Sequence, residues 1–65
     1  MTYPLKRLRQ LAGLSQAELA RVIGVSRHTV YSWECGRRQV PAAMWALTLE
    51  RVPRAAKLLE WEERL

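Results

Sequence analysis

Residues 16–35, QAELARVIGVSRHTVYSWEC, have the spacing of two short helices around a tight corner. Apolar residues share one face of the first helix at positions 19, 20 and 23, and one face of the second at positions 30 and 33. Gly24 stands between them, where a chain leaving a helix often needs a positive φ. Ser26 follows at an N-cap position. Helix, glycine turn and capped second helix predict a helix-turn-helix.

A further helix is predicted before this motif, ending near Ala12, with Leu5 and Leu8 turned inward. Gly13 ends that helix. Ser15 precedes the first motif helix, and Glu18 stands three residues later, which is the pattern of a capping box.

The sequence resembles the Cro and phage-repressor type of helix-turn-helix proteins, the XRE family. The resemblance runs without gaps from about residue 5 to residue 41 and rests on residues 14–16, 18–20, 23–26, 30, 33, 34 and 36. It implies an all-α fold: a compact, five-helix, lambda-repressor-like DNA-binding domain. We expect one such domain over residues 1–65, with residues 41–65 as its dimerisation region.

Composition limits the other possibilities. A chain of 65 residues is near the lower limit for a self-sufficient core, and its single cysteine, Cys35, cannot form an internal disulfide. With one Cys and one His, we expect neither a metal site nor a cofactor, and the chain lacks the constellation that an enzyme needs. We expect no signal peptide and no membrane span, and therefore a cytoplasmic protein.

The charge lies in the first part of the chain. Residues 1–51 carry eight basic and three acidic side chains, whereas residues 52–65 carry three of each, so the first part holds the whole net charge of +5. A basic body with a neutral tail favours double-stranded DNA as the partner of the body.

The resemblance implies that the second motif helix enters the major groove and reads bases with its N-terminal half. We expect its outward side chains to contact bases: Arg27, His28, Thr29 and Ser32. Arg27 is the first candidate, because a guanidinium fork matches guanine O6 and N7; its alternative is a phosphate contact. The alternative for His28 is a merely solvated side chain.

Phosphate contacts are expected around this helix. The resemblance implies one for Gln16 at the start of the first motif helix, and the loop after the second motif helix adds two arginines. The full set is Gln16, Tyr31, Arg37, Arg38 and, as weaker candidates, Lys6 and Arg7. Where relatives often carry an asparagine that binds phosphate, this chain has Cys35.

The resemblance also implies an ion pair between Arg9 and Glu34 that braces the motif. The alternative is two unrelated, solvated charges. A partly buried pair would be worth more than the ~0–1 kcal/mol of a surface salt bridge.

Residues 41–51 are apolar nearly all round, which a surface helix of a small domain is not. We expect one face to pack on the motif and another on a second copy of the chain; the alternative is that all these side chains fill the monomer core. Residues 55–65 predict a last helix, with Leu65 on its apolar stripe, that either covers the first helix or extends the dimer contact. The expected interface residues are Trp45, Leu49, Val52, Leu58 and Trp61.

Together these features predict a sequence-specific DNA-binding regulator, a homodimeric repressor on an inverted repeat, without membrane contact. Short relatives in phages and mobile elements provide the implied context. The alternative is an antitoxin-like module whose apolar helices bind another protein, with DNA binding secondary.

Overall fold

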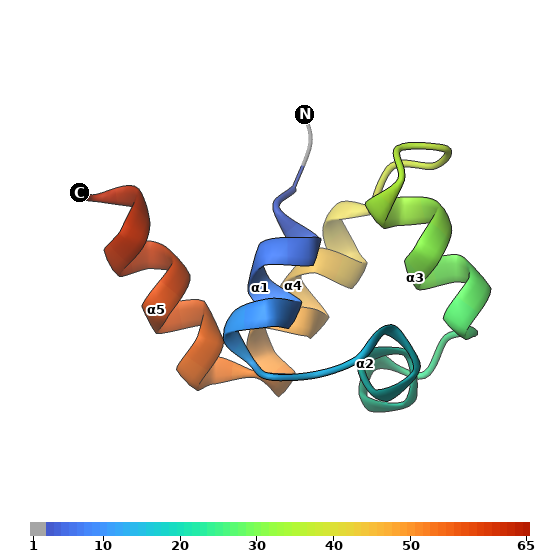
Figure 1. The fold of residues 1–65 in the computed structure, drawn as a ribbon, viewed down its shortest axis with the longest axis horizontal. Helices are drawn as coiled ribbons and strands as arrows, with labels where there is room; N and C mark the ends of the chain where they lie inside the picture. The colour runs from blue at the N-terminus through green and yellow to red at the C-terminus, as the bar shows by residue number, and fades with distance from the viewer. Residues whose placement is uncertain (1–2) are drawn as a thin grey trace.

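The computed structural model describes residues 3–65, which contain five helices and no strand (Figure 1). The helices are α1 (Leu5–Leu11), α2 (Gln16–Ile23), α3 (Arg27–Glu34), α4 (Ala42–Arg51) and α5 (Pro53–Glu63). The predicted all-α helix-turn-helix fold is confirmed, with boundaries that shift by one or two residues. α1 ends before Ala12, and α5 already begins at Pro53, whose fixed φ suits a first helical turn.

The motif is held by the caps that its sequence predicts. Ser15 Oγ accepts a hydrogen bond from the backbone N–H of Glu18 at 3.1 Å, and the Glu18 carboxylate accepts one from the N–H of Ser15 at 2.8 Å. Gly24 ends α2 at φ 76°, in the left-handed region. Ser26 Oγ then accepts the N–H of Thr29 at 3.1 Å and starts α3. These contacts define where each motif helix begins and where α2 ends.

Two apolar clusters form the core. The first fills the elbow of the motif, where α1, α2 and α3 meet, and consists of Leu5, Leu19, Ala20, Ile23, Val30 and Val40. The second joins α5 to α1 and consists of Leu8, Ala55 and Leu59. Trp45 of α4 packs against both clusters, so α4 connects the motif to the C-terminal helix.

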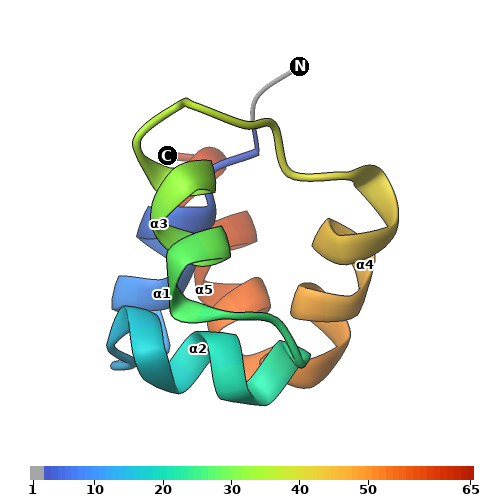
Figure 2. The same ribbon diagram turned by 90° about the vertical axis from the view of Figure 1, so that its right-hand side faces the viewer.

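Helices α3 and α5 lie at opposite ends of the long axis of the molecule, with α1 and α4 between them (Figures 1 and 2). α5 packs back on α1, which is one of the two placements that the sequence left open. The face that it buries carries Ala55 and Leu59. The stripe of Leu58, Trp61 and Leu65 stays exposed, by 45%, 62% and 87%.

Two polar residues of α4 have structural roles that the sequence analysis missed. Thr48 is fully buried and donates a hydrogen bond to the carbonyl of Met44 at 2.7 Å. Arg51 donates to the carbonyl of Val22 at 3.2 Å, which satisfies an open carbonyl in the last turn of α2. None of the helices in residues 3–65 has the length and apolar character that crossing a bilayer requires.

Candidate nucleic-acid interface

Helix α3 lies at the end of the molecule away from α5 (Figure 1), and exposed side chains form a ridge along it. The ridge consists of Arg27, His28, Tyr31 and, at the C-cap, Cys35, all of them exposed. At about 100° per residue, these four positions fall within an arc of about 100° of the helix surface. Val30 lies outside that arc and is fully buried in the elbow. α3 is therefore anchored by one face and free along the other.

Ser32 does not belong to this ridge. It was expected to point outward with the base-reading residues, but it is only 4% exposed, so that expectation was wrong. Its position in α3 turns it toward the protein, and its carbonyl accepts the N–H groups of Arg37 and Arg38 as the chain leaves the helix. Thr29 is half-buried, and its hydroxyl lies 2.8 Å from Ser26 Oγ, which leaves mainly its methyl group for an outside contact.

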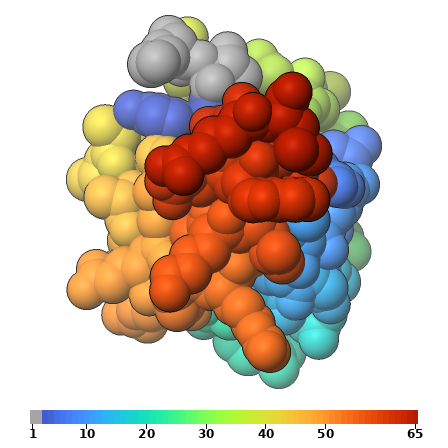
Figure 3. All heavy atoms as spheres, turned by 90° about the vertical axis from the view of Figure 1, so that its left-hand side faces the viewer, coloured from blue at the N-terminus to red at the C-terminus, as the bar shows by residue number. Residues whose placement is uncertain are grey.

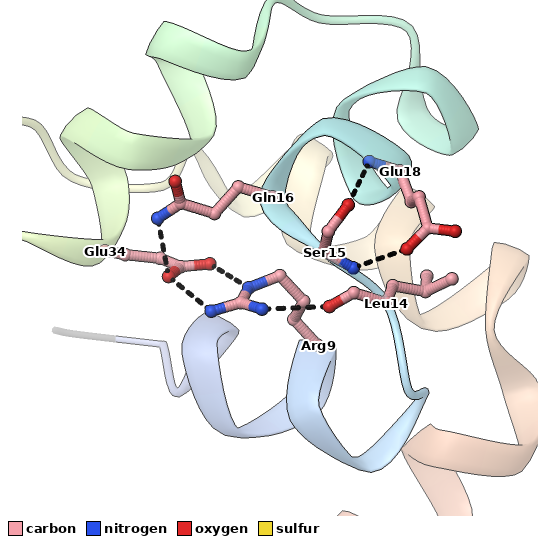
Figure 4. Close-up of polar contacts among 6 residues, drawn as sticks. All are labelled: Arg9, Leu14, Ser15, Gln16, Glu18 and Glu34. Carbon is pink, nitrogen blue, oxygen red and sulfur yellow. Dashed lines mark hydrogen bonds and ion pairs between the residues drawn. The ribbon is translucent and has the colours of Figure 1, made fainter.

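An ion pair holds α3 against α1. Arg9 donates to both carboxylate oxygens of Glu34, at 2.6 Å from Nε and 3.0 Å from Nη2 (Figure 4). Arg9 Nη1 also donates to the carbonyl of Leu14 at 2.9 Å. Gln16 Nε2 adds a bond of 3.2 Å to Glu34. The pair that the resemblance implied is thus present and connects three helices.

The ion pair is largely screened from solvent, with the Glu34 side chain 4% exposed and that of Arg9 15% exposed. Burial favours the neutral form of Glu34, but the hydrogen bonds from Arg9 and then Gln16 outweigh it and hold the pKa of the carboxyl below its usual value. The bond to Glu34 likewise raises the pKa of the Arg9 guanidinium. Both groups are therefore charged at neutral pH, and their contact does not depend on small changes in pH.

Two shallow hollows lie beside the ridge and share two residues. Gln16, Arg27, His28 and Tyr31 line one hollow of about 290 Å³. The other, of about 230 Å³, is lined by Lys6, Arg9, Gln16, Tyr31, Glu34 and Cys35. Gln16 and Tyr31 therefore lie where the two hollows meet, so the expected contact residues of α1, α2 and α3 form one continuous surface.

The predicted phosphate-binding cations divide into two groups. Lys6, Arg37 and Arg38 are exposed, and within residues 3–65 none of them forms an ion pair. Arg7 differs, because its guanidinium binds the carboxylate of Glu62 on α5, with 3.0 Å from Nε to Oε2. A phosphate contact of Arg7 would have to compete with Glu62 for the guanidinium, and it stays a prediction.

The residues predicted at the dimer interface also fall into two groups, one half-buried and the other exposed. Trp45, Leu49 and Val52 are half-buried and pack against the second core cluster, and the Trp45 ring stacks on Tyr3 at 5.1 Å between centroids. The chain itself therefore covers much of the apolar surface of α4 that had been assigned to a second copy. Leu58 and Trp61 remain exposed on α5.

Helix α2, the turn at Gly24 and helix α3 together form a helix-turn-helix motif. A family model described as a helix-turn-helix domain matches residues 4–64, and the chain belongs to this family. Neither the curated proteins nor the solved structures contain a match to the chain. Helix-turn-helix domains commonly place their second motif helix in the major groove of DNA, and the second motif helix of this chain is α3.

Proposed function

We propose that this protein is a sequence-specific transcriptional regulator that reads the major groove with the ridge of α3. The observation that carries the proposal is the ridge itself, with Arg27 and His28 exposed at the N-terminal end of an anchored helix. Arg27 offers a fork for guanine, and Lys6, Arg37 and Arg38 supply positive charge around the helix for phosphates. Gln16, between the hollows, supplies a hydrogen-bonding amide beside the ridge.

The protein acts as a homodimeric repressor of the Cro and XRE type on an inverted repeat. Support comes from α5, where Leu58, Trp61 and Leu65 leave an apolar stripe without cover from the chain. Figure 3 views this side, with α5 across the face toward the viewer. A second copy bound there leaves α3 free, because α3 lies at the other end of the molecule. The inverted repeat would present two half-sites whose centres lie about 34 Å, or a multiple of that distance, apart.

The same stripe favours a second candidate function. An antitoxin-like module would use Leu58, Trp61 and Leu65 to bind a different protein and would bind DNA secondarily. The mass of the purified protein in solution gives its oligomeric state and so distinguishes the two candidates. A stable dimer supports the repressor, and a monomer that aggregates through this stripe supports the partner-binding module.

A fluorescence-anisotropy titration tests DNA recognition directly. The labelled duplex comes from upstream of the protein's own gene, with a scrambled duplex as control, and both are titrated over a series of salt concentrations. Tighter binding to the native duplex that persists at higher salt is the expected result. Equal binding to both duplexes, with the same steep salt dependence, would mean that the protein binds only the DNA phosphates. That result would contradict sequence-specific regulation.

A further inference from the structure

Tyr31 occupies the centre of the exposed surface of α3. It follows His28 by one turn and precedes Cys35 by one turn, in the middle of the ridge. Its neighbour Ser32, on the side of the helix expected to read bases, is 4% exposed, whereas Tyr31 is 44% exposed. The residue able to reach beyond the first turn of α3 toward a ligand is therefore Tyr31 and not Ser32.

The ring of Tyr31 lies beside the ring of His28. Its centroid lies 6.2 Å from that of His28, with an angle of 30° between the two rings. This separation is within the range of interacting aromatic pairs, which gain stability beyond their buried area. The His28 ring therefore lies against one side of the Tyr31 ring.

The two hollows beside α3 place Tyr31 at the centre of the exposed surface and not at its edge. Tyr31 lines both hollows, so the surface continues on either side of it. Lys6 lines the hollow on one side and Arg27 the hollow on the other. Arg27 is the side chain proposed to reach base edges on the floor of the major groove, and Tyr31 lines the same hollow, so Tyr31 lies next to that floor.

We propose, given the DNA-binding function inferred above, that Tyr31 is a specificity-determining residue whose ring packs on the C5-methyl group of a thymine. Among the base edges in the major groove, thymine alone presents a methyl group, and an aromatic ring is a suitable apolar contact for it. The ring face makes this contact, and the hydroxyl is not required.

The test begins with selection of binding sites from a random duplex library by the wild type, Tyr31→Phe and Tyr31→Ala. The wild type and Tyr31→Phe are expected to select the same motif. Tyr31→Ala is expected to lose the preference for thymine at one position of each half-site and to keep the rest of the motif. Thermal unfolding of each variant checks the fold, which should persist because Tyr31 is 44% exposed.

A second measurement changes only the DNA. Deoxyuridine replaces thymine at that position of the selected site, which removes the methyl group and nothing else. The wild type is expected to lose about fourfold in affinity, the amount that burial of one methyl group contributes. Tyr31→Ala is expected to bind both duplexes equally. The wild-type arm needs no variant, so the proposal stays testable even if Tyr31→Ala unfolds.

The outcomes separate this proposal from the function on which it rests. If Tyr31→Ala selects the unchanged motif and binds all sequences more weakly, Tyr31 contacts phosphate and the assignment is overturned. If Tyr31→Phe is weakened as much as Tyr31→Ala, the hydroxyl makes the contact and the ring–methyl assignment is wrong. If the wild type selects no motif at all, the proposed sequence-specific function itself fails.

Discussion

Arg9 and Glu34 lie 25 residues apart in the sequence and meet through two hydrogen bonds, of 2.6 Å and 3.0 Å. Their contact ties the end of the recognition helix α3 to α1, and Gln16 of α2 joins it at 3.2 Å. A planar guanidinium matches both oxygens of a carboxylate at once, which gives the contact a defined geometry. The orientation of α3 therefore depends on a polar contact as well as on the apolar elbow.

Replacing Arg9 alone should cost far more than replacing both partners. Arg9→Met leaves the Glu34 carboxylate 4% exposed and without its cation, and we expect a loss of about 3 kcal/mol in the free energy of unfolding, at the low end for buried pairs. The double variant Arg9→Met/Glu34→Leu leaves no buried charge and should recover much of that loss. Urea unfolding of the wild type, both single variants and the double variant measures the coupling. Equal losses in Arg9→Met and the double variant would contradict it.

The same pair predicts how stability depends on pH. The pKa of Glu34 is lowered in the folded chain from its ordinary value of 4.5, so the unfolded chain binds a proton more readily. The contribution of Glu34 is therefore fully present above about pH 4.5 and is lost as the pH falls through the lower, folded value. Thermal unfolding between pH 7 and pH 3 measures this loss.

Glu34→Gln serves as the control for that pH dependence. Glu18 and Glu62 also have lowered pKa values, through hydrogen bonds from Ser15 and Arg7 respectively, so part of the acid sensitivity remains in the variant. We expect Glu34→Gln to be less stable at pH 7 and to lose less stability on acidification. Parallel curves for the two proteins would show that Glu34 does not contribute.

Replacing Gly24 should lower the stability of the fold because of its backbone conformation alone. Its φ is 76°, and a Cβ built there meets no atom within 4 Å, so the cost of a side chain is strain and not a clash. Gly24→Ala is expected to lose about 1–2 kcal/mol of stability. Gly24→Asn, which enters the left-handed region more easily, should lose less. Equal stability of Gly24→Ala and the wild type would contradict the assignment.

Arg27 and Arg37 should affect DNA binding in different ways. Arg27→Ala is expected to relax the preference for one base pair, at a cost of about 1–3 kcal/mol for the preferred site. Arg37→Ala should weaken binding to all duplexes alike and reduce the salt slope by about one. Anisotropy titrations of both variants against the native and scrambled duplexes distinguish these effects. A uniform loss in Arg27→Ala would reassign that residue to phosphate.

Trp61 should affect assembly more than folding, because its side chain is 62% exposed. If α5 forms the dimer contact, sedimentation equilibrium should give a dimer for the wild type and a monomer for Trp61→Ala at the same concentration. Glu63→Ala is the matched control, since Glu63 is exposed and roughly 200° around the helix from Trp61. An unchanged dimer in Trp61→Ala would place the contact elsewhere.

The elements and the motif could be predicted from the sequence because local rules determine them. The capping box at Ser15, the N-cap at Ser26 and the turn at Gly24 depend on residues within four positions of one another. The apolar periodicity of α2 and α3 likewise identified Leu19 and Val30 as core residues. For such features the sequence by itself was sufficient.

The tertiary structure decided which face of α5 is buried and which polar side chains of α3 are exposed. α5 carries two apolar stripes, and the smaller one, Ala55 with Leu59, is buried because it lies against Leu8 of α1. The position of α5 also places Glu62 beside Arg7, so the two form an ion pair. Burial of Ser32 and exposure of Tyr31 follow from how α3 is anchored in the elbow and by Glu34. Periodicity along one helix cannot determine which side chains are buried, exposed or paired in this way. Each case depends on the position of a helix that is distant in the sequence.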